Sequence, residues 1–333
     1  MAHATNVQVA VVGAGPAGLA SALSLSALGC DVTLLAPAFD PVHAASDART
    51  TALLSSSVAL LENLGVWGLC GNEAAPLTAI RIVDDRGDLL RAPEVLFRAS
   101  ELGLPDFGAN IANPALNAAL NAAVAASPRV SRVPTSAVTR ITPGETSVRL
   151  DLAEGESLNA ALLVAADGRG SLSRTSAGIG VRKWHYPQSA IATAFRHTRG
   201  HEGITAELHR RTGPLTIVPM PRDASSLVWV EEPAEASRIG GLDDRGFLHL
   251  LEQRLQGLLG SIHAPGARAV HPLSGLSAER MGQNRVALVG EAAHVIPPIG
   301  AQGLNLGLRD ACVLAECVAE ARERGITASK ASW

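Results

Sequence analysis

The chain has 333 residues and a formal net charge of −3 at pH 7, and 47% of its residues are hydrophobic although only 3% are aromatic. This length suits a medium-sized enzyme with one or two domains, and the near-neutral charge argues against a nucleic-acid-binding surface. No run of about 18 apolar residues is free of charges and helix breakers, so we expect no transmembrane helix. Since an apolar run begins at Val7, we expect no signal peptide and a cytoplasmic protein.

The first motif is a glycine-rich turn between a strand and a helix. Residues 7–12 form a short apolar run, the sequence GAGPAG follows, residues 17–28 have a helical pattern, and residues 31–35 have a second strand pattern. In such a G-x-G-x-x-G context the first glycine permits the tight turn, the second lets a pyrophosphate approach the backbone, and the third lets the helix pack on the strand. The motif predicts a dinucleotide site, for NAD or FAD alike, at Gly13, Gly15 and Gly18.

The second strand ends without the acidic residue that dinucleotide folds usually place there. The expected position is Ala36, in the sequence LLAPAFD. An acidic residue would accept hydrogen bonds from the ribose hydroxyls, and its loss removes a charge-assisted contact of roughly 1.5–3 kcal/mol. Asp40 lies close in the sequence, but we do not assign it this role. We therefore expect weaker binding at the adenosine end of the cofactor without loss of the fold.

The middle of the chain alternates between helix and strand patterns. In chain order these are a helix to residue 64, strand-like runs within 80–91 around a turn at 85–87, a helix at 110–124, strands within 138–152 and at 158–165, strands from 186 to about 230, and an amphipathic helix at 247–259. The runs within 80–91 and 186–230 predict a second, β-rich domain.

Cysteine and histidine spacings do not indicate a metal site. The four cysteines form no CxxC pair, so we expect them to be reduced packing residues. Three histidines fall within 13 residues without an HxH or HExxH spacing, so we expect surface histidines and no metal. The residues concerned are Cys30, Cys70, Cys312, Cys317, His197, His201 and His209.

The most informative stretch is 286–311, which reads VALVGEAAHVIPPIGAQGLNLGLRDA. It begins with an apolar run typical of a buried parallel strand, turns at Gly290, continues through the rigid pair Pro297 and Pro298, and becomes helical from Leu304. A helix start presents free N–H groups and the positive end of the macrodipole. Glycines at this point let the backbone approach a flat anionic ligand closely.

The motifs resemble those of class A FAD-dependent aromatic monooxygenases, and most closely the UbiH-type hydroxylases of ubiquinone biosynthesis. The resemblance rests on the first glycine turn and on three further segments, DARTTAL (47–53), DGRGSLSR (167–174) and VGEAAHVIPPIGAQGLNLG (289–307). It implies an α/β fold in which a Rossmann-like FAD-binding domain, residues 1–75, 105–180 and 273–333, is interleaved with a smaller β-sheet substrate domain, residues 76–104 and 181–272. Family members usually continue with further C-terminal helices, which we expect to be missing here.

The resemblance also implies which residues hold FAD. Arg49 would lie near the phosphates and the ribityl chain, and Asp167 and Arg174 near the pyrophosphate. Glu291 departs from the aspartate of many class A enzymes, but it keeps the charge, so we expect function to be retained. The implied cofactor-binding set is Gly13, Gly15, Gly18, Arg49, Asp167, Gly168, Arg174, Gly290, Glu291, Gly300, Ala301, Gln302, Gly303, Leu304 and Asn305.

Three residues of the last motif are catalytic candidates. Pro297 and Gly300 would form a rigid, apolar wall and a close backbone approach beside the flavin. The helix start near Gly303 would stabilise the anionic reduced flavin through backbone N–H groups. His294 would act either as a general acid or base or as a hydrogen-bonding residue of the loop, and we favour the second role.

The implied reaction is ring hydroxylation of a polyprenyl phenol in ubiquinone biosynthesis. NADH or NADPH would reduce FAD, O₂ would add to the reduced flavin, and the resulting hydroperoxide would hydroxylate the ring. A lipophilic substrate is compatible with peripheral contact at the inner face of the membrane, and the family is compatible with a quinone-synthesis complex or a homo-oligomer. Two alternatives stay open: a hydroxylase of a small soluble aromatic compound, and a non-catalytic subunit of a quinone-synthesis complex.

Overall fold

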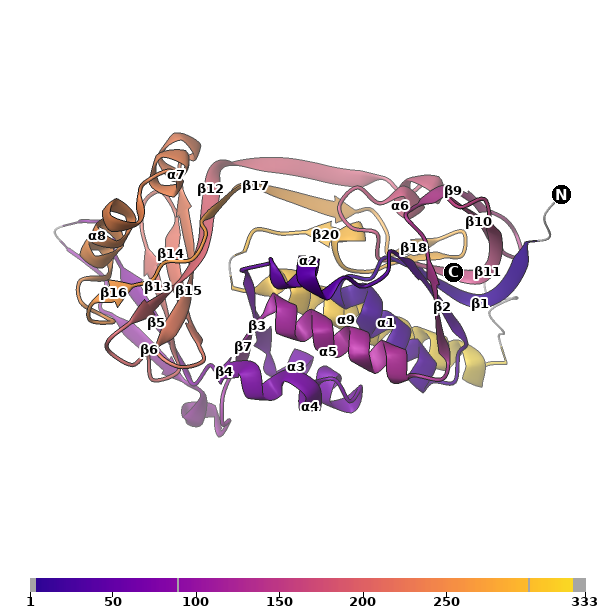
Figure 1. Cartoon of the computed structure of the whole chain (residues 1–333), viewed down its shortest axis with the longest axis horizontal. Helices are drawn as coiled ribbons and strands as arrows, with labels where there is room; N and C mark the ends of the chain where they lie inside the picture. The colour runs from indigo at the N-terminus through magenta and orange to yellow at the C-terminus, as the bar shows by residue number, and fades with distance from the viewer. Residues whose placement is uncertain (1–3, 89, 299, 326–333) are drawn as a thin grey trace.

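The computed structural model describes residues 4–88, 90–298 and 300–325. Its strands and helices form two lobes, and two long strands, β12 (Val181–His197) and β17 (Ala269–Ala278), run from one lobe to the other (Figure 1). The first strand, β1 (Thr5–Val12), and the last helix, α9 (Gln302–Glu323), belong to the same lobe. The two ends of the chain therefore contribute to one structural unit.

The first lobe is organised on an eight-stranded sheet in the order β18-β19-β11-β1-β2-β8. In addition, β10 pairs with β11, and β9 pairs with β10. β1 pairs in parallel with β11 and β2, as β2 does with β8 and β11 with β19. The bounds of the other strands are β2 (Val32–Ala36), β8 (Val130–Pro134), β9 (Val138–Pro143), β10 (Val148–Leu152), β11 (Ser157–Ala165), β18 (Gly282–Gln283) and β19 (Val286–Leu288).

Alternate residues of this sheet enter two different cores, because successive side chains of a strand point to opposite faces. On one face, Val11 and Leu34 pack against α1 (Pro16–Ala27), α5 (Asn113–Ala126) and α9, which lie together in Figure 1. On the other face, Val12 and Leu35 pack against side chains of β9 and β10 such as Ile141. The remaining helices are α2 (Pro41–Ala45), α3 (Ser55–Asn63), α4 (Trp67–Cys70), α6 (Leu172–Ser176), α7 (Pro233–Gly240) and α8 (Asp244–Leu255).

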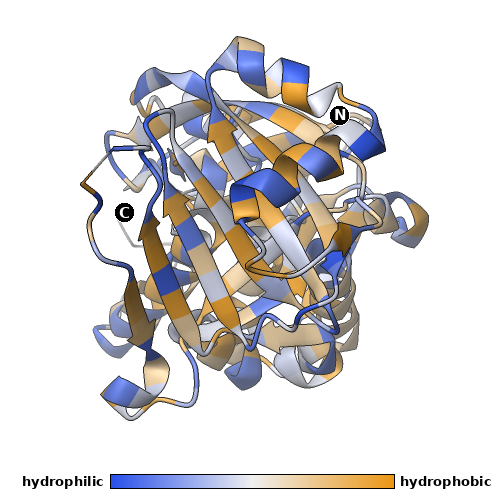
Figure 2. Ribbon diagram, turned by 90° about the vertical axis from the view of Figure 1, so that its left-hand side faces the viewer, coloured by the Kyte–Doolittle hydropathy of each residue, from blue (hydrophilic) through white to orange (hydrophobic). Residues whose placement is uncertain are grey.

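The second lobe is organised on a nine-stranded, mostly antiparallel sheet in the order β20-β17-β12-β15-β14-β13-β5-β6, with β16 beside β12. Figure 2 shows hydrophobic and hydrophilic residues alternating along these strands. Buried side chains such as Phe195 and Trp229 pack against Phe247 of α8. The other bounds are β5 (Ala79–Asp84), β6 (Val95–Arg98), β13 (Ile204–His209), β14 (Pro214–Met220), β15 (Ala224–Glu231), β16 (Ile262–His263) and β20 (His294–Val295).

A small third sheet, β3 (Thr50–Leu54), β7 (Gly108–Ala112) and β4 (Ala74–Pro76), lies between the lobes. Two side chains of this sheet bond to the second lobe: Thr50 Oγ1 donates to Ser226 Oγ at 2.9 Å, and Asn110 Nδ2 donates to Pro219 O at 2.8 Å. These bonds fix the position of the second sheet relative to the segment that carries Arg49.

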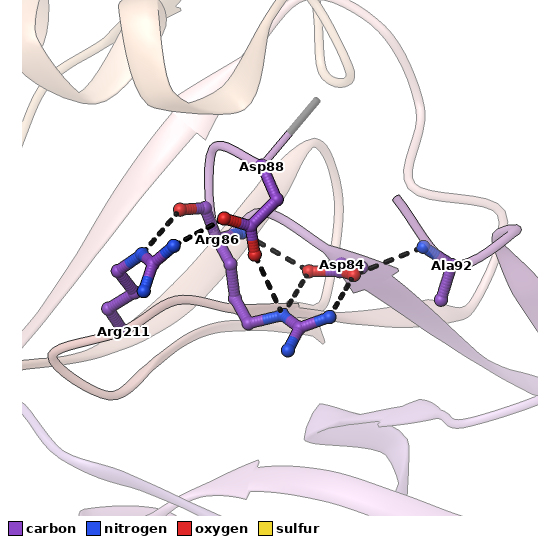
Figure 3. Close-up of polar contacts among 5 residues, drawn as sticks. All are labelled: Asp84, Arg86, Asp88, Ala92 and Arg211. Atoms are coloured by element: carbon purple, nitrogen blue, oxygen red, sulfur yellow. Dashed lines mark hydrogen bonds and ion pairs between the residues drawn. The ribbon is translucent and has the colours of Figure 1, made fainter. Parts of the chain in front are cut away.

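The loop after β5 is held by a polar network (Figure 3). Arg86 Nε and Nη2 each donate to a carboxylate oxygen of Asp84 at 2.8 Å, and the Ala92 amide donates to Asp84 at 3.1 Å. Arg211, from the turn between β13 and β14, donates to Arg86 O at 3.2 Å and pairs with Asp88. The network joins the loop between β5 and β6 to the neighbouring hairpin.

The observed architecture confirms the predicted fold class, and the strands expected at 7–12, 31–35, 158–165 and 286–289 all form. Three predicted bounds are wrong by more than two residues. The amphipathic helix expected at 247–259 is α8, Asp244–Leu255, and it ends where Gln256 adopts a left-handed conformation. The helix expected at 110–124 begins only at Asn113, because Gly108–Ala112 pairs with β3 and β4 and Pro114 favours a helix start at that point. The second strand expected within 80–91 forms instead at Val95–Arg98.

Two expectations about single residues are also wrong. His197 is buried rather than at the surface, with Nδ1 bonded to Arg199 O at 2.9 Å and Nε2 to Ser225 Oγ at 3.0 Å. Cys317 is exposed and is not a packing residue, whereas Cys30 and Cys70 are buried.

Within the described ranges, no cluster of three or more His, Cys, Asp and Glu side chains could hold a metal ion, and no helix has the length and apolar character that a membrane crossing needs. Residues 326–333 lie outside the described residues.

Candidate functional site

The turn between β1 and α1 contains three glycines, of which Gly13 and Gly18 cannot be replaced without a clash. Gly13 has φ +106°, and a Cβ there would lie 2.2 Å from the Ala166 carbonyl oxygen. A Cβ on Gly18 would lie 2.2 Å from the Gly13 carbonyl oxygen. A Cβ on Gly15 would meet no atom within 4 Å, because this glycine faces a cavity. The three glycines therefore have the separate roles that the motif predicts: a tight turn, an open approach and close packing.

Two adjoining cavities, of about 960 and 360 Å³, run along the carboxyl ends of the parallel strands. Asp47, Arg49 and Asn117 line both, so we treat the two cavities as one dinucleotide groove with a larger and a smaller part. The larger part is lined by residues including Gly13, Ala36, Arg132 and Asp167, and the smaller part by residues including Gly15, Gly18, Gly168, Gly290, Glu291, Gly303 and Leu304.

Arg49 lies in the groove as one half of a bidentate ion pair. Its Nε and Nη2 donate to the two carboxylate oxygens of Asp47 at 2.8 Å each, and Asn113 Nδ2 donates to Asp47 at 3.0 Å. The hydrogen bonds from Arg49 lower the pKa of Asp47 to about 2, so the carboxylate is ionised at neutral pH. The Arg49 side chain stays 62% exposed, which leaves N–H groups for an anionic ligand in the groove.

The segment after β11 contains a second compact set of bonds. Asp167 accepts hydrogen bonds from Ser171 Oγ at 2.5 Å and from the amide and hydroxyl of Ser173 at 2.9 Å each. Arg174 is buried and donates to Ala292 O at 2.7 Å and to Arg169 O at 3.0 Å. Arg174 thus joins this segment to the loop of the last motif from behind the groove, and in the described ranges it does not line either cavity.

The last motif reaches the groove because three small residues pack closely. A Cβ on Gly307 would lie 3.2 Å from both the Ala17 Cβ and the Gly290 Cα, and a Cβ on Gly290, whose φ is +60°, would lie 3.0 Å from the Ala17 Cβ. The start of α1, the turn after β19 and the first turns of α9 therefore converge. Among the described residues, no side chain caps α9 at its N-terminus near Gly303 and Leu304.

His294 is held by a carboxylate that our sequence analysis did not identify. Its Nε2 lies 2.6 Å from Asp310 Oδ2, and the same oxygen accepts the Gly290 amide at 2.9 Å. The hydrogen bond that His294 donates to Asp310 raises the pKa of His294 above its ordinary value, although burial opposes the shift. His294 Nδ1 is buried and has no hydrogen-bond partner among the described residues. Asp310 thereby joins α9 to both ends of the Gly290–His294 segment.

Asn305 is buried and connects α9 to β3. Its Oδ1 accepts the Leu54 amide at 2.8 Å, and its Nδ2 donates to Ala52 O at 2.8 Å and Ala301 O at 2.6 Å. In the part of the chain that the structure describes, Asn305 does not line the groove. The same is true of five other predicted residues of the motif: His294, Pro297, Gly300, Ala301 and Gln302. Their roles toward the cofactor stay predictions.

Ala301 has φ +53°, a left-handed conformation that is strained for a residue with a Cβ. We expect Ala301→Gly to raise the free energy of unfolding by about 0.5–1 kcal/mol, because relief of this strain outweighs the greater entropy of glycine in the unfolded chain. Ala319→Gly, in the interior of the same helix, is the control and should lower it by about 1 kcal/mol. Urea titration measures both, and equal destabilisation by the two changes would contradict the expectation.

The groove fits FAD on structural grounds. Gly15 leaves open space at the N-terminus of α1, where backbone N–H groups and the macrodipole favour a pyrophosphate. Asn117 Oδ1, in a residue that lines both parts, is buried without a partner among the described residues. Together with the start of α9, these features suit a long dinucleotide with a flat anionic ring. The interleaved sheets and this groove define the fold of the class A flavoprotein hydroxylases.

The chain belongs to the family described as FAD binding domain, whose model matches residues 6–327. Ubiquinone hydroxylase UbiL of Rhodospirillum rubrum is 34% identical over 321 residues, which cover 96% of this chain and 73% of that protein. The 3-demethoxyubiquinol 3-hydroxylase of Escherichia coli is 32% identical over 323 residues, which cover 96% and 81%. FAD is therefore the cofactor of this chain, which is an FAD-dependent monooxygenase.

A solved structure agrees with the fold. The crystal structure of p-nitrophenol 4-monooxygenase PnpA from Pseudomonas putida matches with a TM-score of 0.76 at 20% identity, covering 96% of this chain and 82% of that one. At this identity the likeness bears on the fold alone.

Proposed function

We propose that this chain hydroxylates the aromatic ring of a polyprenyl phenol in ubiquinone biosynthesis, with O₂ and with NADH or NADPH as reductant. The observation that carries the proposal is the identity of 34% and 32% to two ubiquinone-pathway hydroxylases over 96% of the chain. The groove supports it, since the residues that line it come from all the motifs that resemble the UbiH type.

Bound FAD supplies the redox chemistry and the activation of O₂. The chain would contribute position and charge. Gly303 and Leu304, at the start of α9, line the smaller cavity, where backbone N–H groups would favour negative charge on a bound flavin ring. Pro297 and Pro298 precede this helix start and would exclude water beside the ring. His294, held by Asp310, would keep a proton near the loop that presents Gly290.

We also propose the division into an FAD-binding domain, residues 1–75, 105–180 and 273–333, and a substrate domain, residues 76–104 and 181–272. A peripheral contact with the membrane is supported by five exposed apolar side chains within the segment 90–104. These are Leu90, Val95, Phe97, Leu102 and Leu104. Such a contact would bring a lipophilic substrate to the second lobe. Assembly into a quinone-synthesis complex or a homo-oligomer belongs to the same proposal.

The test is turnover by the FAD-reconstituted full chain with a prenylated phenol and, separately, a small soluble phenol. We expect a yellow protein that oxidises NADH or NADPH and incorporates one ¹⁸O atom from ¹⁸O₂ into the prenylated ring. Product from the small phenol alone would overturn the assignment of the substrate. A protein that cannot be reconstituted with FAD, or that yields H₂O₂ without any hydroxylated product, would overturn the proposed activity.

A further inference from the structure

The larger part of the groove has no acidic side chain at the end of β2, where dinucleotide folds usually place one, but an arginine lines the same cavity. Ala36 ends β2, is 4% exposed and lines the larger cavity. Asp40, which also lines it, already accepts the amides of Val42 at 2.9 Å and His43 at 3.2 Å as the cap of α2. The first carboxylate after β2 in the sequence is therefore occupied by the chain's own donors.

The other carboxylates at this cavity are occupied in the same way. Asp47 is paired with Arg49, and Asp167 accepts bonds from two serines. Glu154, beside the cavity, accepts Thr135 Oγ1 at 2.6 Å and the Ser136 amide at 2.8 Å. Each of these carboxylates would have to break hydrogen bonds that hold the wall of the groove before it could accept hydrogen bonds from the ribose hydroxyls.

Arg132 lies on β8, beside β2, and lines the same cavity. The strand register places it opposite Leu34, two residues before Ala36, on the face of the sheet that packs on α5. Its Nη2 donates to Asn121 Oδ1 of α5 at 2.6 Å. Among the described residues this is its one hydrogen bond, and no carboxylate lies within 4.0 Å of it. Burial without a counter-charge lowers the pKa of Arg132, so a ligand anion would compensate its desolvation.

We propose that Arg132, positioned by Asn121, replaces the usual carboxylate at the adenosine ribose of FAD, and that this end of the groove consequently prefers adenine nucleotides carrying a 2′-phosphate. A carboxylate accepts hydrogen bonds from two ribose hydroxyls and repels a phosphate. A guanidinium donates to a hydroxyl oxygen and binds a phosphate through two parallel bonds. An arginine in place of a carboxylate should therefore favour a ribose with a 2′-phosphate over one with a free 2′-hydroxyl. The inference rests on this groove being the FAD site.

The experiment measures displacement of FAD from the full-length protein by two probes, adenosine 5′-monophosphate and adenosine 2′,5′-bisphosphate, followed by the recovery of flavin fluorescence. For the wild type we expect the bisphosphate to displace FAD at a concentration at least tenfold lower than the monophosphate. Arg132→Gln should bring the two concentrations within about twofold. Ala36→Glu should reverse the order, because it adds the carboxylate that repels the 2′-phosphate.

Arg140→Gln is the matched control, since it removes an exposed arginine of the adjoining β9 that does not line the cavity. It should keep the tenfold difference. Equal displacement by the two probes in the wild type, or a preference that survives in Arg132→Gln, would overturn the inference. Both readouts concern nucleotide binding, so a protein that binds FAD but hydroxylates no phenol would defeat the proposed substrate and leave this inference intact.

Discussion

Gly15→Ala is expected to weaken FAD binding by at least tenfold while the protein remains folded. Gly15 has φ −70°, which any residue adopts, and a Cβ there meets no protein atom within 4 Å. The methyl group would instead occupy the space at the start of α1 where the pyrophosphate approaches the backbone. The free energy of unfolding should change by no more than about 1 kcal/mol, because alanine is a poorer helix cap but lowers the entropy of the unfolded chain.

The neighbouring glycines provide the contrast. In Gly13→Ala the new Cβ would lie 2.2 Å from a backbone oxygen at a φ of +106°, and in Gly18→Ala it would also lie 2.2 Å from one. We expect each to lower the free energy of unfolding by more than about 3 kcal/mol, because backbone cannot move aside as a flexible side chain can. Thermal unfolding of the apoprotein and fluorescence titration with FAD separate the two effects. If Gly15→Ala unfolds like its neighbours, or binds FAD as the wild type does, the assignment of this end of the groove is wrong.

Local patterns were sufficient to predict most of the strands and helices that form the groove, but not α2 or β8, which also line it. The run from Val7 to Val12 and the glycines after it specify a strand, a turn and a helix through side-chain period and backbone conformation, which are properties of neighbouring residues. The same holds for the helix that begins near Leu304, whose apolar face at Leu308, Ala311 and Val318 is buried as predicted. Pairing between distant segments decided the cases that failed, such as Gly108–Ala112, which joins β3 and β4 instead of the helix.

The side chains that position the site could be predicted less well, because their partners are remote in the sequence. Arg174 is predicted beside the pyrophosphate, yet it does not line the groove among the described residues, and it donates one bond to Arg169 O and the other to Ala292 O, which is 118 residues away. Arg132 was not singled out, because nothing local distinguishes it from a surface arginine. Asp310 did have a signal: Gly303, Gly307 and Asp310 follow helical spacing, so a carboxylate was to be expected on the face of α9 that carries the groove glycines.

Among the residues on the groove-facing side of α9, Asp310 is the one whose substitution should most reduce the stability of the protein and its affinity for FAD. Its carboxylate accepts the Gly290 amide and holds His294, and both side chains of the pair are largely buried, with exposures of 18% for His294 and 15% for Asp310. We expect Asp310→Asn to lower the free energy of unfolding by about 2 kcal/mol near pH 6, since it removes a partly buried charge pair. It should also weaken FAD binding, because Gly290 and Glu291 line the smaller cavity.

The pH dependence of the loss of stability in Asp310→Asn shows whether His294 and Asp310 form an ion pair or only pack together. Because the pKa of His294 is higher in the folded protein than its ordinary value of about 6.5, the stabilisation by the imidazolium is fully present below pH 6.5 and is lost as the pH rises through the folded-state pKa. The difference between wild type and Asp310→Asn, measured by urea unfolding from pH 5.5 to 9, should therefore shrink with rising pH. Glu320→Gln, an exposed acid of the same helix, should change stability by less than about 0.5 kcal/mol throughout. A difference that stays constant or grows with pH would mean that Asp310 acts only through the Gly290 amide and that His294 is neutral in the folded protein.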